Sequence, residues 1–184
     1  DNSPTCFQAV ENFRKMLKDA GYSELLECEK WEIVPGGKYF VTRNDSSIIA
    51  FSVPKKDFTG FQLICSHTDS PSFKIKENAE MDADGKYTKL NVEGYGGMLC
   101  APWFDRPLSV AGRIAVRTEN GIETRLVNLD QDLAMIPNLA IHMNREANSG
   151  YKYNIQKDML PIVGEASSKG KLMKLVAENA GVKE

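Results

Sequence analysis

Two residues with the chemistry and spacing of a metal site stand close together in the first half of the sequence. His67 and Asp69 are separated by one residue in the run His67-Thr68-Asp69-Ser70-Pro71. In an extended backbone, side chains two positions apart point to the same side. One imidazole nitrogen could then bind a metal while a carboxylate holds the other nitrogen, although His67 and Asp69 need not be each other's partners. The alternative interpretation is a polar His–Asp pair at the mouth of a loop, without a metal.

The element expected to position His67 is a buried strand. The short, mostly apolar run Phe61-Gln62-Leu63-Ile64-Cys65 follows Gly60 and is typical of a central strand covered on both faces. His67 would then lie at the carboxyl end of this strand, where open α/β sheets bind their ligands. This placement favours the metal interpretation over that of a surface histidine.

Upstream of this strand, the sequence predicts one helix and one hairpin. Ser3 followed by Pro4 is a helix-start signal, apolar residues then recur at helical spacing, and Gly21 is placed to end the helix. Residues 38–53 contain two strand-like runs around a polar turn at residues 44–47, which indicates a β-hairpin.

Beyond Pro71 the sequence changes to charged β-hairpins. The expected elements are a strand at residues 86–93, a hairpin of residues 110–117 with 122–128, and a helix at residues 171–180. Asp84-Gly85 and Asn120-Gly121 are suited to the turns because these residue types tolerate positive φ angles, and Gly181 can end the helix.

The composition gives no support for nucleic acid or a membrane as a partner. The 23 Lys and Arg are balanced by 25 Asp and Glu, so the net charge is -2. No apolar run approaches the roughly 20 residues that cross a bilayer, and the first residues lack the basic and apolar regions of a signal peptide. We therefore predict a soluble, cytoplasmic protein whose four cysteines are reduced. The absence of an initiator Met suggests that the N-terminus was trimmed.

Three further features admit a functional and a structural interpretation. His142 is the second of two histidines, and on sequence alone the stretch in which it lies favours a loop packed near the domain surface. Trp103-Phe104-Asp105-Arg106 combines aromatic, acid and base, but such clusters more often stabilise a turn through an Asp–Arg contact beside a packed ring. The glycines near residue 96 are better explained by a backbone bend than by a phosphate loop, because no Lys-Ser/Thr pair follows them.

Several motifs in order along the whole chain resemble the aspartyl aminopeptidases of metallopeptidase family M18. The matching stretches are Ser3-Pro4-Thr5 with Ala9-Val10, residues 43–51, residues 67–71, residues 92–97, residues 103–113 and residues 136–142. The resemblance implies an α/β subunit in which the start of an α/β/α zinc-peptidase domain is followed by an inserted β-rich dimerisation domain. Residues 1–71 would be the N-terminal part of the peptidase domain, and residues 72–184 the dimerisation domain.

The resemblance also implies a site with two zinc ions, bridged by a carboxylate and a water. His67 stands where one metal ligand is expected, and Asp69 would be the catalytic residue that orients it. By the same resemblance, His142 would reach a neighbouring subunit's active site and bind the substrate, and a direct role as a metal ligand is conceivable. The other metal ligands and the glutamate general base of the family have no counterpart in these 184 residues.

Two hypotheses from different classes follow. In the first, the parent protein is a zinc aminopeptidase that releases Asp or Glu from peptide N-termini and forms a homo-oligomer, and this chain is an inactive fragment of it. In the second, the isolated chain is a non-catalytic dimerisation or assembly module, because one histidine and a few carboxylates do not complete a two-metal site.

Overall fold

The computed structural model describes residues 2–183 and divides into two compact units, residues 1–70 and residues 71–184. Helices and sheets occur in both units, so the predicted mixed α/β character is confirmed. None of the helices within residues 2–183 is both long and apolar enough to span a membrane.

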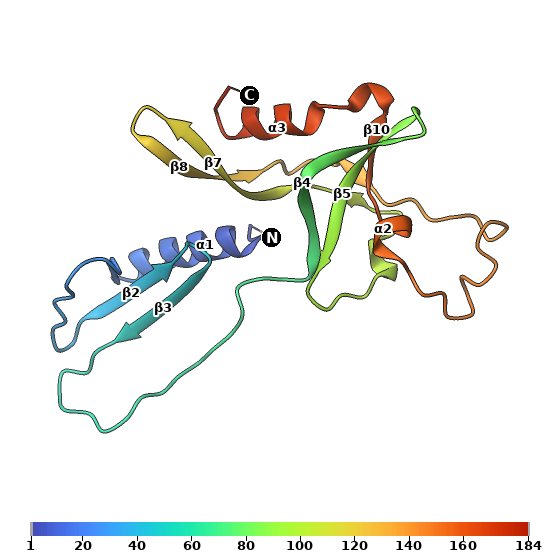
Figure 1. Cartoon of the computed structure of the whole chain (residues 1–184). Helices are drawn as coiled ribbons and strands as arrows, with labels where there is room; N and C mark the ends of the chain where they lie inside the picture. Colours follow the sequence, from blue (N-terminus) through green and yellow to red (C-terminus); the bar gives the residue numbers. More distant parts are fainter. Residues whose placement is uncertain (1, 184) are drawn as a thin grey trace. The chain divides into compact units, whose positions relative to one another are not determined.

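The first unit packs one helix on a three-stranded sheet (Figure 1). Its elements are α1 (Cys6–Asp19), β1 (Ser23–Leu25), β2 (Lys38–Arg43) and β3 (Ser47–Ser52). β1 runs parallel to β2, and β2 and β3 form the predicted antiparallel hairpin, in register from Lys38↔Ser52 to Arg43↔Ser47. Val10 of α1 and Phe40 of β2 are fully buried and form the centre of this unit's small core.

The helix end was predicted correctly, and the helix start was not. Gly21 has φ +78, and its N–H donates to the carbonyl of Lys18, as in the motif that commonly ends helices. At the other end the cap is Thr5, whose hydroxyl accepts from the N–H of Phe7, and not Ser3. Thr5 is also a good capping residue and lies closer to the apolar stripe, so the helix begins two residues later than predicted.

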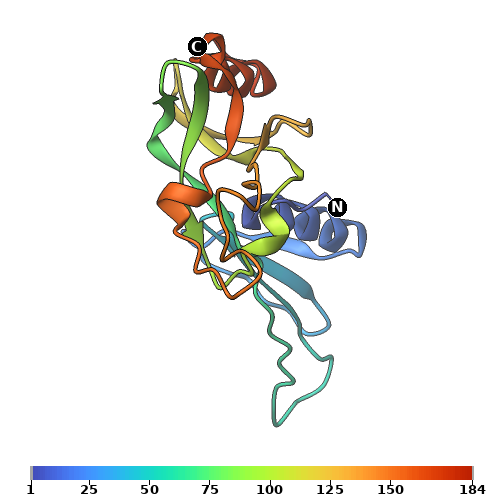
Figure 2. The same ribbon diagram turned by 90° about the vertical axis from the view of Figure 1, so that its right-hand side faces the viewer.

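The predicted central strand at residues 61–65 is not formed. None of the sheets built by residues 2–183 includes these residues, and the exposed fractions of Phe61 and Ile64 are 81% and 100%. A strand requires a neighbouring strand to pair with its N–H and C=O groups, and no such neighbour lies beside this run in the described part of the chain. Residues 54–66 instead extend away from the three-stranded sheet in both ribbon views (Figure 2).

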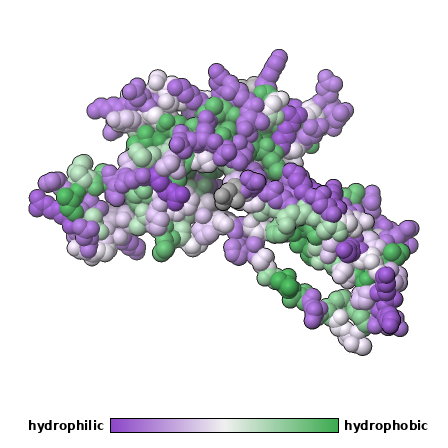
Figure 3. Space-filling view, turned by 180° about the vertical axis from the view of Figure 1, so that it is seen from behind, coloured by the Kyte–Doolittle hydropathy of each residue, from purple (hydrophilic) through white to green (hydrophobic). Residues whose placement is uncertain are grey.

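Hydrophobic side chains appear along this extended segment, at the lower right of Figure 3. His67 therefore follows an irregular apolar segment and not the end of a strand. Because no strand precedes His67 within residues 54–66, the site depends on contacts made by the motif itself.

The second unit is β-rich, as predicted from the sequence (Figure 1). Its elements are β4 (Ser72–Ala83), β5 (Tyr87–Tyr95), η1 (Ala101–Trp103), β6 (Pro107–Leu108), β7 (Ala111–Thr118), β8 (Gly121–Asn128), β9 (Ala134–Met135), α2 (Ile155–Asp158), β10 (Ile162–Glu165), η2 (Ala166–Ser168) and α3 (Lys171–Asn179). Five strands form a sheet in the order β4-β5-β10-β9-β6, while β7 and β8 pair as a separate hairpin.

A continuous hydrophobic core lies between these elements. Its buried members are Leu90, Val92, Val127, Ala134, Leu172 and Val176. The predicted β5 and β7–β8 strands and the C-terminal helix are confirmed, and Gly181 with φ +67 follows α3 as expected. α3 packs against β8, and Asn179 exchanges hydrogen bonds with the backbone of Asn128.

Candidate functional site

His67 and Asp69 are brought into direct contact in the first unit. The Nδ1 atom of His67 lies 2.6 Å from the backbone carbonyl oxygen of Asp69 and 3.3 Å from its carboxylate Oδ1. A carbonyl oxygen only accepts hydrogen bonds, so Nδ1 is the nitrogen that donates. In the neutral imidazole this arrangement leaves the lone pair on Nε2, the form in which a histidine binds a metal. The side chain of His67 is 78% exposed, so Nε2 is accessible.

Thr68 connects the motif to the folded part of the first unit, a role that the sequence did not indicate. Its hydroxyl donates to the backbone carbonyl oxygen of Ser46 at 2.8 Å. Ser46 belongs to the turn between β2 and β3, in which Asn44 and Asp45 both have φ +51. The residue between the two candidates thus ties the motif to the hairpin.

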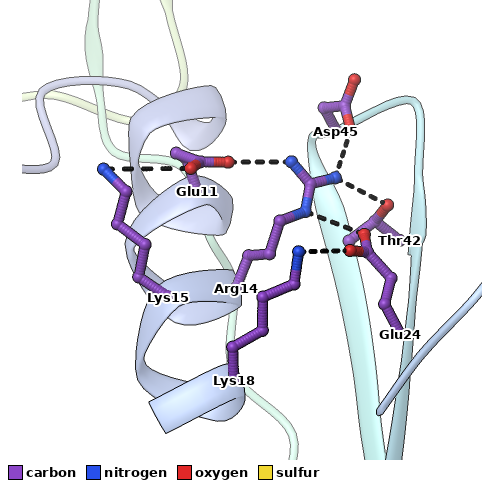
Figure 4. A network of polar contacts seen from close by, with 7 residues as sticks. All are labelled: Glu11, Arg14, Lys15, Lys18, Glu24, Thr42 and Asp45. Carbon is purple, nitrogen blue, oxygen red and sulfur yellow. Dashed lines mark hydrogen bonds and ion pairs between the residues drawn. The ribbon is translucent and has the colours of Figure 1, made fainter. Parts of the chain in front are cut away.

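The same turn is joined to α1 by Arg14 (Figure 4). Its guanidinium lies 2.8 Å from Glu11, 2.9 Å from Glu24 and 2.8 Å from Asp45, with a side chain that is 22% exposed. Burial lowers the pKa of Arg14, but its hydrogen bonds to Asp45 and Glu11 and the charge of Glu24 outweigh that effect and raise it above the ordinary value. The guanidinium of Arg14 therefore stays charged at neutral pH.

The donors present do not complete a zinc site. Within residues 2–183, no three side chains of the His, Cys, Asp and Glu types gather where they could share a metal ion. Protein zinc sites use three or four such ligands. The accessible Nε2 of His67 fits the chemistry of one zinc ligand, with Asp69 as the group that orients it, and the remaining ligands are not among these residues.

His142 lies in the second unit, on the irregular stretch of residues 137–154. It is exposed and sits in a turn in which the N–H of Met143 donates to the carbonyl oxygen of Ala140 at 2.8 Å. His67 and His142 thus belong to different units, and each stands on a segment without regular secondary structure.

The cluster around Asp105 has the structural role predicted for it, with a different partner. Asp105 has φ +55, and its carboxylate accepts from the N–H of Asn138 at 2.8 Å, in place of the predicted contact with Arg106. The ring of Trp103 packs edge-on against Phe73, with 5.0 Å between the centroids. Asp105 thereby holds the first residues of the segment that leads to His142.

The glycine-rich stretch after β5 is a bend, as expected. Gly96 has φ +75, and a Cβ at this position would lie 3.4 Å from the Cα of Pro71. A glycine is favoured here because the backbone φ angle is positive and because a side chain would lie close to the backbone of Pro71.

Comparisons with known proteins match the chain over its whole length. The family model described as aminopeptidase I zinc metalloprotease (M18) matches residues 1–184. A protein of Clostridium acetobutylicum named probable M18 family aminopeptidase 2 is 48% identical over 191 residues, which cover 98% of this chain and 43% of the relative. A protein of the same name from Pseudomonas aeruginosa is 46% identical over 165 residues, with 89% of this chain and 38% of the relative covered.

Solved structures give the same result. The match to a chain of the cryo-EM structure of the Ape4 and Nbr1 complex has a TM-score of 0.90 at 38% identity, and covers 98% of this chain and 38% of that one. Chaetomium thermophilum mApe1 matches with a TM-score of 0.88 at 33% identity, over 99% of this chain and 45% of that one. The S. cerevisiae mApe1 dodecamer matches with a TM-score of 0.76 at 25% identity, over 99% and 42%. The chain spans less than half the length of the relatives cited.

Proposed function

Because the chain belongs to the aminopeptidase I zinc metalloprotease family (M18), we propose that it is part of a zinc aminopeptidase that releases Asp or Glu from peptide N-termini. The supporting observation is the contact between Nδ1 of His67 and the carbonyl oxygen of Asp69 at 2.6 Å. This contact directs the lone pair of Nε2 outward, as a metal ligand requires. The preference for acidic residues rests on the resemblance of the motifs to aspartyl aminopeptidases.

In this proposal His67 is one ligand of a two-zinc centre, and Asp69 holds its imidazole in the metal-binding tautomer. Bound zinc supplies a Lewis acid and lowers the pKa of a coordinated water toward about 7. The part played by the present residues is to fix the ring and its tautomer before the metal arrives. Asp69 does this through its carbonyl oxygen at 2.6 Å and, more weakly, through its carboxylate at 3.3 Å. The other ligands and the general base would come from the remainder of a polypeptide as long as the relatives.

The proposal also assigns a domain to each part of the chain. We assign residues 1–71 to the start of the peptidase domain and residues 72–184 to an inserted dimerisation domain. His142 would bind the substrate in a neighbouring subunit, with a role as metal ligand as the alternative. A solved relative that is described as a dodecamer supports assembly into a homo-oligomer.

The test compares the full-length protein with two single substitutions. We expect cleavage of N-terminal Asp and Glu peptides in preference to Leu peptides, and about two zinc ions per subunit by elemental analysis. His67→Ala should lower zinc content and reduce kcat/KM at least about 10³-fold, because a ligand is lost. His142→Ala should reduce kcat about 10- to 100-fold and leave the zinc in place.

The zinc content and activity of the two variants together distinguish the proposed roles of His67 and His142. Loss of zinc from His142→Ala to the same extent as from His67→Ala would make His142 a ligand instead of a substrate contact. Normal zinc content and activity in His67→Ala would refute the proposed site. The 184-residue chain tested in parallel should show little hydrolysis, since residues 2–183 bring no three metal-binding side chains together. If the full-length protein forms oligomers but cleaves no peptide, the chain belongs to an assembly module.

A further inference from the structure

We propose that Arg14 and Thr68 are positioning residues for His67, acting through the turn between β2 and β3. We call the contacts Arg14–Asp45 and Ser46–Thr68 the Arg14–Thr68 path. The inference rests on the proposed function in one respect, that His67 binds zinc. Neither Arg14 nor Thr68 is expected to touch a metal or a substrate.

His67 needs such contacts because the chain that precedes it is not held by the sheet. Residues 54–66 make no backbone–backbone hydrogen bond with any part of residues 2–183. The apolar side chains before the motif are also exposed, with Leu63 at 79% and Ile64 at 100%. The backbone of His67 is therefore not held from its N-terminal side in this structure. The contacts that locate it come from the residues immediately after it.

Thr68 supplies the first of these contacts. The hydrogen bond from its hydroxyl to the carbonyl oxygen of Ser46 spans 22 positions of sequence and is 2.8 Å long. Because Thr68 directly follows His67, fixing its side chain limits the freedom of the neighbouring backbone. The adjoining contact between His67 and the carbonyl of Asp69 then sets the direction of the imidazole. Thr68 thus links the ring's local arrangement to the hairpin.

The turn that receives Thr68 is itself held by α1. Asn44 and Asp45 both adopt φ +51, a left-handed conformation that Asn and Asp tolerate and that contacts with their surroundings help to keep. Arg14 provides such a contact, because its Nη2 donates to Oδ1 of Asp45 at 2.8 Å. The same guanidinium contacts Glu11 on α1 and Glu24 on β1, so the turn is tied to both elements (Figure 4).

The geometry of this cluster suits arginine in particular. One planar guanidinium reaches three carboxylates, and its Nη2 also donates to the hydroxyl of Thr42 at 3.2 Å. A lysine ammonium is a single compact charge and does not present this fork of donors. We therefore expect Arg14→Lys to keep the charge and lose most of the positioning effect.

The test measures zinc affinity by chelator competition, and kcat/KM, in the full-length protein. Thr68→Val has nearly the same shape as threonine but no donor, and should weaken zinc binding about 10- to 100-fold, the usual range for groups that orient a metal ligand. Thr68→Ser keeps the hydroxyl and should restore affinity to within about threefold. Arg14→Met should weaken zinc binding about 10-fold. The zinc affinity of Arg14→Lys should be close to that of Arg14→Met and below that of the wild type.

A matched control is available in the same sheet. Arg43 forms an ion pair with Glu27 at 2.6 Å, but its side chain is 79% exposed. Arg43→Met removes an arginine–glutamate pair outside the path and should leave zinc affinity unchanged. A second control is the double variant Arg14→Met with Thr68→Val. If the two residues act through one turn, the double variant should bind zinc about as strongly as the single variant with the lower zinc affinity. Independent effects would instead multiply the fold-losses of the two single variants.

The outcomes separate this inference from the proposed function. If His67→Ala loses zinc while Thr68→Val binds zinc as wild type does, the path is refuted and the zinc ligand stands. If His67→Ala keeps its zinc, the proposed function has failed, and the path fails with it. Should Arg14→Met not fold, Thr68→Val and Thr68→Ser still decide the question, because they change one hydroxyl on an extended segment. Independent, multiplicative losses in the double variant would also overturn the inference.

Discussion

The two segments that contain the candidate histidines, residues 54–70 and residues 137–154, are both irregular, yet they are held in different ways. The second segment forms turns of its own, such as the hydrogen bond from the N–H of Ser149 to the carbonyl oxygen of Glu146 at 2.9 Å. Over residues 54–66 the first segment has no backbone–backbone hydrogen bond to any described residue.

Their aromatic residues show the same contrast. In the second unit, the ring of Tyr153 packs edge-on against Tyr151 at 5.3 Å and at a tilt against Phe104 at 5.0 Å between centroids, so the segment packs on the region after η1. In the first unit, Phe58 and Phe61 contact each other at 5.2 Å and remain largely exposed. A segment rich in polar turn residues can satisfy its backbone locally, whereas an apolar segment requires a neighbouring element to cover it.

The largest expected difference is in susceptibility to proteolysis. Both segments expose apolar side chains, for example Leu63 at 79% and Met143 at 74%, so a protease that cleaves beside apolar residues finds sites in each. Cleavage within residues 54–66 of the 184-residue chain should be about 10- to 100-fold faster, because no local structure must open first. Mass spectrometry of the first fragments measures the ratio. Equal rates in the two segments would contradict the comparison.

The next largest effect should come from two matched isoleucines. Ile136 is fully buried beside Phe104 just before the second segment, and Ile64 is 100% exposed on the first. Ile136→Ala should lower the free energy of unfolding by about 2–5 kcal/mol, and Ile64→Ala by less than about 0.5 kcal/mol. Urea denaturation of both variants of the 184-residue chain measures this. A cost above about 1 kcal/mol for Ile64→Ala would mean that the first segment is packed in solution.

A smaller effect is expected from removing a hydrogen bond at the start of the second segment. Asp105→Ala removes the acceptor for the N–H of Asn138 and puts alanine at φ +55, so it should cost about 1–2 kcal/mol. Asp105→Asn is the control, because asparagine keeps an acceptor and tolerates positive φ. Proteolysis at residues 137–154 should rise about 10-fold in Asp105→Ala only. If it rises equally in Asp105→Asn, the charge of Asp105 and not its hydrogen bond holds the segment.

The smallest effect concerns Tyr151 at the end of the second segment. Its hydroxyl donates to Asp158 at 3.1 Å, and this hydrogen bond, with some desolvation and the negative charge of Asp158, raises the pKa of Tyr151 above 10.0. A raised folded-state pKa means that the stabilisation is complete below the unfolded pKa and is lost as pH rises through the folded value. Near neutral pH, the free energy of unfolding should therefore not depend on the ionisation of Tyr151.

Ultraviolet titration of the phenolates is the measurement for Tyr151. We expect Tyr151→Phe to remove a component that titrates at high pH, and Asp158→Asn to move that component to lower pH. An unchanged titration curve in Asp158→Asn would show that Asp158 does not control the phenol.

The parts of the fold that were predicted correctly depend on neighbours in sequence. Gly21 and Gly181 end helices because glycine adopts positive φ without a steric cost, and the β2–β3 hairpin turns at polar residues for a related reason. The contacts that hold the site were not predicted. Thr68 meets Ser46 across 22 positions, and Asp105 meets Asn138 across 33, and no local pattern selects such partners.

The amino-acid sequence by itself determined the family motifs, the glycines that end the helices, and the hairpins. It placed His67 and Asp69 two positions apart, without deciding whether they are each other's partners. The tertiary structure decided which atom of Asp69 meets the imidazole, which turn receives Thr68, and that Arg14 joins this turn to α1. It also decided that the apolar run at residues 61–65 stays outside the sheets. Apolar character favours a strand, but a strand forms only where another strand lies alongside to exchange hydrogen bonds with it.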